Sequence, residues 1–287
     1  MRVPETNLRE FRERGFSVVE GFLSAEELEE AQEALWLHYP RPEEYFANPE
    51  AYPKFGESQF SGLLLFPYKS WALNRLAFHP DLVEMAERLI GTDELHLYKV
   101  ELWAKYAGAI DYTQNHHYDY GNHSIVVPRA DGKWPQITTF ILLSDVSEVD
   151  GPTKLVPREF TKDLDLYPYR LEPGIFKEEE VAATAPAGSM LIYETSVVHR
   201  GSDFGAPGRS RFALLADFQA RGLPWTGKMA WPNRALDANW ADVMARTSVR
   251  ERDLFGFPPP GHEYWNEQTL RDVGLRYPGM DVTPYRR

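Results

Sequence analysis

The spacing of apolar residues predicts a mainly helical first third of the chain. Apolar positions recur at helical spacing after residues 24–27, Ser-Ala-Glu-Glu, which form the pattern of a capping box. A second helix is predicted over residues 80–90, since Pro80 suits the first helical position and Gly91 suits a C-terminal stop. Residues 71–78 are predicted to form another short helix.

From Leu95 onward the apolar period changes from helical to two, which is typical of half-buried strands. Polar and apolar side chains alternate over residues 98–103, and further strands are predicted over residues 136–143, 153–156, 190–199 and 211–220. Turn residues separate these segments. The pattern predicts one domain, with a helical part (1–92), a β-barrel or sandwich core (93–220) and a partly helical C-terminal segment (221–287) that wraps over the barrel.

Composition and charge narrow the range of functions. The 287 residues include no cysteine, so disulfides, thiolate nucleophiles and cysteine zinc sites are excluded. A formal net charge of −12 argues against nucleic-acid binding, which needs a basic surface. The chain has neither an apolar run long enough to span a membrane nor an apolar signal core at its beginning. We therefore expect a cytoplasmic protein with no membrane partner.

Two segments about eighty residues apart carry candidate metal ligands. His117 and Asp119 form a His-x-Asp pair, and His199 ends an apolar run. On a strand, residues two positions apart point to the same side, so His117 and Asp119 would reach one metal together. In the run 191–199, His199 would share its face with the other odd-numbered residues. Two histidines and one carboxylate match the facial triad that binds Fe(II) with open coordination positions.

Other histidines near this motif are weaker candidates. His116 competes with His117, but no carboxylate follows it two residues later, so we expect it beside the site or at the surface. His123 is expected in a loop.

The chain resembles the phytanoyl-CoA dioxygenase family of Fe(II)- and 2-oxoglutarate-dependent oxygenases over most of residues 8–220. The segments that carry the resemblance follow the order of the family: 11–23, 117–119, 150–157, 187–193, 199–202 and 211–214. Residues 158–160 are Arg-Glu-Phe where the family has Gly-Ser-His, so the family role of that position does not carry over. The resemblance implies a mainly β fold with flanking helices, the double-stranded β-helix or jelly-roll barrel of cupin type.

The resemblance also implies a cosubstrate site. Arg211 would pair with the distal carboxylate of 2-oxoglutarate, as a guanidinium binds a carboxylate bidentately. Arg209 has the same strand parity and is the alternative. Lys105, Phe140 and the neighbouring Thr139 stand where the family commonly has residues near the cosubstrate.

The predicted function is hydroxylation of an unactivated C–H bond in a small molecule, with O2 as oxidant and release of succinate and CO2. Since related halogenases replace the acidic ligand by a small residue, Asp119 favours hydroxylation or another oxidation over halogenation. No compact basic cluster near the motifs suits an acyl-CoA, so we expect a smaller metabolite, lipid-like or a natural product. A cupin-like metalloenzyme without 2-oxoglutarate and a non-catalytic jelly-roll binding module are the alternatives.

Overall fold

A six-stranded antiparallel sheet forms the centre of the computed structural model, which describes residues 2–129, 131–225, 231–234 and 236–286. Its strand order is β1-β7-β4-β9-β3-β2. The strands are β1 Phe16–Val19, β2 Leu63–Leu65, β3 Leu95–Tyr106, β4 Gln136–Leu142, β7 Met190–Glu194 and β9 Ser210–Ala220. A second sheet has the order β6-β5-β8 and consists of the short strands β5 Lys154–Leu155, β6 Val181–Ala182 and β8 His199–Arg200.

The two faces of the large sheet have different environments. On β3, Val100, Leu102 and Ala104 belong to the main hydrophobic core that the sheet shares with the helices. The alternate side chains of β3, which include Lys99 and Lys105, line a cavity on the other face. The predicted period of two therefore separates a helix-facing side from a cavity-facing side.

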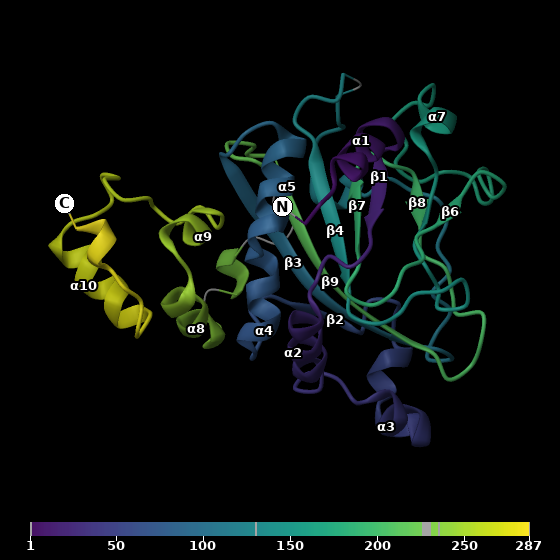
Figure 1. The fold of residues 1–287 in the computed structure, drawn as a ribbon, viewed down its shortest axis with the longest axis horizontal. Coiled ribbons are helices and arrows are strands. Elements are labelled where there is room, and N and C mark those ends of the chain that lie inside the picture. The colour runs from purple at the N-terminus through teal and green to yellow at the C-terminus, as the bar shows by residue number, and fades with distance from the viewer. Residues whose placement is uncertain (1, 130, 226–230, 235, 287) are drawn as a thin grey trace.

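Helices cover the first of these faces, as Figure 1 shows for α4 and α5. The predicted helices over 24–35 and 80–90 are confirmed. Ser24 Oγ accepts a hydrogen bond from the amide of Glu27 (3.2 Å) and the Glu27 carboxylate accepts one from the amide of Ser24 (2.8 Å). Gly91 ends the second helix with a left-handed φ of 84°. The α-helices of this part are α1 Glu5–Arg14, α2 Ala25–Leu35, α3 Pro42–Ala47, α4 Trp71–Asn74, α5 Pro80–Ile90, α6 Tyr120–His123 and α7 Arg158–Thr161.

The C-terminal segment lies beyond α4 and α5, on the side away from the small sheet (Figure 1). Its helices are α8 Asn239–Arg246, α9 Val249–Asp253 and α10 Glu267–Arg276. An aromatic cluster anchors the segment, since the rings of Trp231, Trp240 and Phe255 lie within 6 Å of the ring of Phe66. Short 3₁₀ helices complete the fold at Pro49–Ala51, Pro53–Gly56, Arg75–Phe78, Trp231–Arg234 and Thr283–Tyr285.

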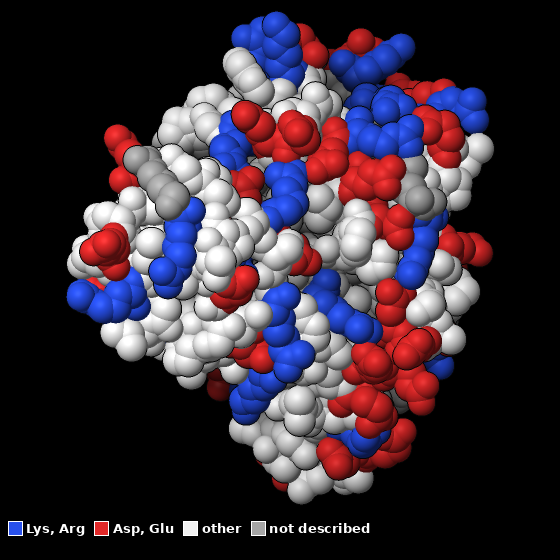
Figure 2. All heavy atoms as spheres, turned by 60° about the vertical axis from the view of Figure 1, so that its left-hand side comes forward, with Lys and Arg blue, Asp and Glu red and all other residues white. Residues whose placement is uncertain are grey.

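The surface agrees with the acidic composition. Figure 2 shows one face on which Lys and Arg side chains lie among Asp and Glu side chains, while acidic groups gather in its lower right part. No single basic surface covers this face, which agrees with the net charge of −12. Among the described residues, none of the helices has the length and apolar character needed to cross a bilayer.

Candidate active site

The backbone places His117 and His199 directly opposite each other. The amide of His117 donates to the carbonyl of His199 (2.9 Å), and the amide of His199 donates to the carbonyl of His117 (3.0 Å). This exchange makes an isolated antiparallel bridge, in which the two side chains project to the same side. The ring centroids are 4.5 Å apart. Two histidines more than eighty residues apart in the sequence are thus brought together by two backbone hydrogen bonds.

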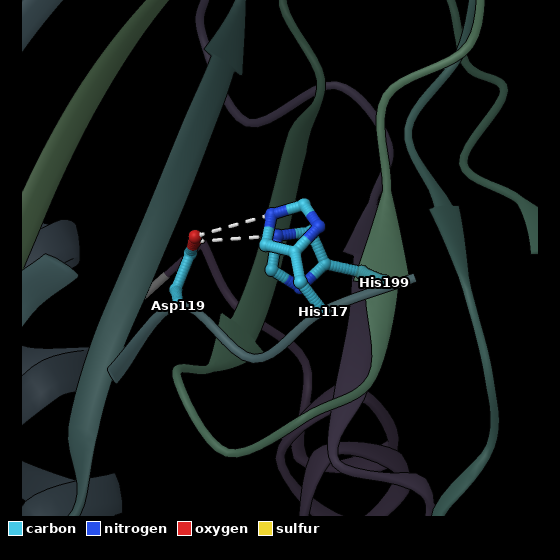
Figure 3. Close-up of side chains that lie close together, drawn as sticks. All are labelled: His117, Asp119 and His199. Carbon is cyan, nitrogen blue, oxygen red and sulfur yellow. Dashed lines mark ion pairs between the residues drawn. The ribbon is translucent and has the colours of Figure 1, made fainter. Parts of the chain in front are cut away.

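Asp119 reaches the two rings from a different local structure than the sequence predicts. His117 lies outside the named strands and forms isolated bridges with His199 and Arg170, and Asp119 has helical dihedral angles (φ −72°, ψ −24°) as the N-cap residue of α6. The predicted alternation along one strand is therefore wrong, but the turn still directs the carboxylate towards the imidazoles. Its Oδ1 lies 3.6 Å from His117 Nε2, and its Oδ2 lies 3.3 Å from His199 Nε2 (Figure 3).

The hydrogen bonds of the two histidines leave the correct nitrogen free for a metal. Nδ1 of His117 lies 2.8 Å from the carbonyl of Asn115, and Nδ1 of His199 lies 3.0 Å from the carbonyl of Val197. A carbonyl can only accept, so each Nδ1 carries a proton and each Nε2 keeps its lone pair. Ligand atoms of the three residues all lie within 4.8 Å of one another. The donor set and its orientation fit a divalent cation such as Fe(II).

The electrostatics of the triad favour a cation at the same point. Burial raises the pKa of the Asp119 carboxyl, but the imidazoles of His199 and His117 outweigh it and hold this pKa well below its usual range. Burial lowers the pKa of His117, but the nearby Asp119 carboxylate and the carbonyl of Asn115 together outweigh this and raise it. The carboxylate thus stays ionised in a buried place and attracts positive charge to the two rings.

The predicted strand over 190–199 is wrong, since the chain forms two strands in different sheets. β7 ends at Glu194, a turn follows, and β8 begins at His199. Tyr193 nevertheless points to the triad, since its hydroxyl donates to Asp119 Oδ2 (2.7 Å). This contact restrains the carboxylate from the large sheet. The sequence analysis did not single out Tyr193, because its pairing with Asp119 depends on the turn between the two strands.

Glu180 connects the two histidine-bearing segments on the side away from the triad. Its carboxylate accepts from Arg200 Nε (2.6 Å) and Nη2 (2.5 Å), and it lies 3.0 Å from His116 Nε2. His116 precedes His117 and Arg200 follows His199, so one carboxylate holds both segments. His116 is buried beside the site, which is one of the two positions that the sequence predicted for it. The sequence analysis missed Glu180, which lies in a segment without periodicity.

His123 lies in neither a loop nor a solvated position. It is the last residue of α6 and is buried. One ring nitrogen lies 2.7 Å from the hydroxyl of Tyr98, and the other lies 3.2 Å from Lys99 Nζ. The expectation of a loop is wrong because Asp119 starts a helical turn that carries His123 back against β3.

A cavity of about 150 Å³, open to solvent, adjoins the triad between the two sheets. Lys105 and Arg211 both line it and lie directly opposite each other in the pairing of β3 with β9. Directly opposed like charges destabilise a sheet. Burial lowers the pKa of Lys105 well below its usual value and that of Arg211 to about 10. Within the described residues neither has an ion pair with a carboxylate, so an anionic group between them would neutralise the pair, which we call the anion site.

The other residues predicted for the cosubstrate divide between the cavity and its surroundings. Phe140 lines the cavity. Thr139 does not, because it shares the helix-facing side of β4 and its hydroxyl donates to the carbonyl of Ala216 (2.8 Å). Arg209 is held outside by a bidentate pair with Asp150, with distances of 2.6 and 3.0 Å. Of the two arginines that the sequence left open, only Arg211 lines the cavity.

The sequence matches the phytanoyl-CoA dioxygenase family over residues 11–211, a span that contains all three residues of the triad. The chain belongs to the phytanoyl-CoA dioxygenase family. The predicted resemblance to this family of Fe(II)- and 2-oxoglutarate-dependent oxygenases is thereby confirmed. No curated protein matches the chain.

Three solved structures show the fold expected for the family. The epimerase SnoN in complex with Fe3+, alpha ketoglutarate and nogalamycin RO is 19% identical, with a TM-score of 0.55 over 78% of this chain and 86% of that chain. The carbocyclase SnoK from nogalamycin biosynthesis is 18% identical (TM-score 0.55; 82% and 91% covered). HygX from Streptomyces hygroscopicus, with nickel and 2-oxoglutarate bound, is 14% identical (TM-score 0.56; 77% and 88% covered). The predicted jelly-roll fold with flanking helices is confirmed.

Proposed function

We propose that this protein is an Fe(II)- and 2-oxoglutarate-dependent dioxygenase that hydroxylates an unactivated C–H bond of a small molecule. His117, Asp119 and His199 are the proposed iron ligands. The observation that carries the proposal is the orientation of both imidazoles, each with Nδ1 bound to a backbone carbonyl and Nε2 directed at the Asp119 carboxylate. Membership of the phytanoyl-CoA dioxygenase family supports the same metal and cosubstrate.

The anion site at Lys105 and Arg211 is the proposed place of the distal carboxylate of 2-oxoglutarate. A bidentate carboxylate on Arg211 would relieve the repulsion between the two cations, and it would favour the protonated form of Lys105. Phe140 would provide an apolar wall beside the cosubstrate. Arg209, already neutralised by Asp150, has no such role.

The side chains around the triad prepare it for this chemistry. When bound, iron and 2-oxoglutarate would activate O2 for insertion of one oxygen atom into a substrate C–H bond, with release of succinate and CO2. Tyr193 would hold the Asp119 carboxylate in place, and Glu180 would hold the two histidine segments in register.

The first test is succinate formation from 2-oxoglutarate, with and without Fe(II), beside a His117→Ala variant. Succinate that requires iron and disappears in the variant is the expected result. Wild-type protein that binds neither iron nor 2-oxoglutarate would contradict the proposal and favour a binding module. Bound iron without 2-oxoglutarate affinity would favour a cupin-like metalloenzyme.

Product mass tests the type of reaction. SnoN and SnoK are named as an epimerase and a carbocyclase, so reactions other than hydroxylation are known among similar folds. Hydroxylation adds one oxygen atom to the substrate, epimerisation leaves its mass unchanged, and oxidative ring closure removes two hydrogen atoms. Mass spectrometry of the product after incubation under ¹⁸O2 separates these outcomes, with label in the product expected for the hydroxylase.

A further inference from the structure

The side chains that β3 and β9 direct towards the cavity differ in charge and polarity from one end of the strands to the other. In register, the pairs are Lys105 with Arg211, Trp103 with Ala213, Glu101 with Leu215 and Lys99 with Asp217. Six residues of strand separate the first pair from the last, which is about 20 Å at 3.3 Å per residue. The cavity therefore has a cationic end, at Lys105 and Arg211, and a second end that is lined by Lys99 and Glu101, with Asp217 buried behind Lys99.

The second end is a buried cluster with more acid than base. Lys99 Nζ lies 2.8 Å from Asp217 Oδ2 and 3.5 Å from Glu101 Oε2, so one ammonium serves two carboxylates. The three residues are only 4%, 0% and 2% exposed, respectively. Burial raises the pKa of Asp217 to about 7, with repulsion from Glu101 among the further causes. Carboxylates this deeply buried are rare unless they are fully paired.

Of the two acids, Glu101 is the one that lines the cavity. Its Oε2 accepts from the indole Nε1 of Trp103 (3.0 Å) and faces Lys99 at the longer of the two distances. Within the part of the chain that the structure describes, its other oxygen has no hydrogen-bond partner. Glu101 lines the same cavity as the metal triad. A buried carboxylate oxygen that opens onto a cavity is completed by a donor from the ligand.

We propose that Glu101 binds a protonated amino group of the substrate, so that the enzyme acts on amine-bearing small molecules. This inference rests on the proposed function, which assigns the cationic end to 2-oxoglutarate and leaves the Glu101 end to the substrate. The side chains that surround this end give the substrate an apolar body, since they include Phe60, Leu63 and Leu215. The substrate class is a mainly apolar amine.

An anionic substrate group does not fit this end. Lys99 is the cation there, and its ammonium already pairs with Asp217 at 2.8 Å. An added carboxylate would face Glu101 without a free counter-charge. A neutral hydroxyl could donate to Glu101, but it would leave the excess negative charge of the cluster uncompensated, so it should bind more weakly than an ammonium.

Three probes with the same ring test this proposal: cyclohexylamine, cyclohexanol and cyclohexanecarboxylate. Their affinities are measured by calorimetric titration into the protein loaded with Fe(II) and 2-oxoglutarate, without O2. We expect the amine to bind at least tenfold more tightly than the alcohol, and the carboxylate to bind most weakly. Equal affinities, or a preference for the alcohol or the carboxylate, would overturn the proposal. This comparison uses wild-type protein, so it does not depend on the folding of a variant.

Glu101→Gln then locates the contact, because glutamine can still accept from Trp103 but carries no charge. We expect amine affinity to fall at least tenfold and cyclohexanol affinity to stay within twofold. Glu57→Gln, at an exposed acid, is the matched control and should bind all probes as the wild type does. Amine affinity unchanged in Glu101→Gln would show direct ligation of the metal or binding elsewhere, and would also overturn the proposal.

Separate measurements distinguish failure of the proposed dioxygenase function from failure of the proposed amine substrate. Titration of 2-oxoglutarate and Fe(II) into wild-type protein without any probe tests the proposed function alone. If neither binds, the dioxygenase proposal fails, and the probe series can still be read on the unloaded protein. If both bind and the probes show no amine preference, only the substrate proposal fails.

Discussion

The cationic end of the cavity and the candidate metal triad are built in different ways. Lys105 and Arg211 stand opposite each other on two long, continuous strands, β3 and β9. The triad stands on short, irregular pieces: isolated bridges at His117, a helix N-cap at Asp119 and a two-residue strand at His199. Regular strands position side chains through their own hydrogen-bond ladder. Irregular segments need additional contacts, which Tyr193, Glu180 and two backbone carbonyls supply.

The largest effect is expected from the triad itself. Asp119→Ala removes the carboxylate that attracts a cation to both imidazoles, so Fe(II)-dependent succinate formation should fall at least 100-fold. Succinate assay and iron content measure the change, with Asp163→Ala at an exposed acid as the control. Full activity in the Asp119 variant would refute its assignment as a ligand.

A substitution at the anion site should change the KM for 2-oxoglutarate and leave the affinity for Fe(II) unchanged. Arg211→Gln removes a charge-assisted bidentate pair, so the KM for 2-oxoglutarate should rise about 30-fold while Fe(II) affinity stays unchanged. Arg209→Gln is the matched variant, because Arg209 pairs with Asp150 outside the cavity, and it should change KM less than threefold. A larger effect at Arg209 than at Arg211 would reverse the assignment.

A substitution of Glu180 tests whether the irregular segments that carry His117 and His199 need side-chain contacts to hold the two histidines in position. Glu180→Gln weakens the link between His116 and Arg200, so Fe(II) affinity should fall about tenfold, as is typical of residues that orient metal ligands. The KM for 2-oxoglutarate, measured at saturating iron, should change less than twofold. Glu178→Gln, at an exposed neighbour, is the control. Unchanged metal affinity would show that the backbone bridge suffices alone.

The smallest effect is expected in the free energy of unfolding, from the ion pair of Asp150 with Arg209 near the cationic end. Burial raises the pKa of Asp150, but its hydrogen bonds with Arg209 and Ser147 outweigh this and lower it to about 2. Because this pKa is below the ordinary value of about 4, the stabilisation is complete above pH 4 and is lost as the pH falls through 2.

Asp150→Asn should therefore lower the free energy of unfolding by about 1 kcal/mol at pH 7. The difference from wild type should shrink as the pH falls from 4 towards 2. Urea unfolding at pH 7 and at pH 3 measures it, with Glu148→Gln, whose acid is exposed, as the control. An equal difference at both pH values would show that charge is not the cause.

Strand periodicity was sufficient to predict the long, regular strands of the molecule. Alternation on β3 predicted which of its side chains share a face, whereas Lys105 and Arg211 were named from the family resemblance, because Arg209 has the same strand parity as Arg211. Periodicity could not decide between the neighbouring residues Thr139 and Phe140 of β4, because that choice depends on which face of the strand meets the helices. It also failed over 190–199, where the chain leaves one sheet and enters the other.

The sequence by itself determined the helix caps and the alternation of the long strands, because these depend on neighbours within a few positions, and its motifs named the three candidate ligands. Only the tertiary structure decided that Asp119 reaches the histidines from a helix start and that Glu180 joins their segments. It also placed Arg209 outside the cavity and Glu101 at its wall beside Lys99, which pairs with the buried Asp217. These arrangements join residues far apart in the chain, and their energies depend on burial and paired charge, which no local pattern encodes.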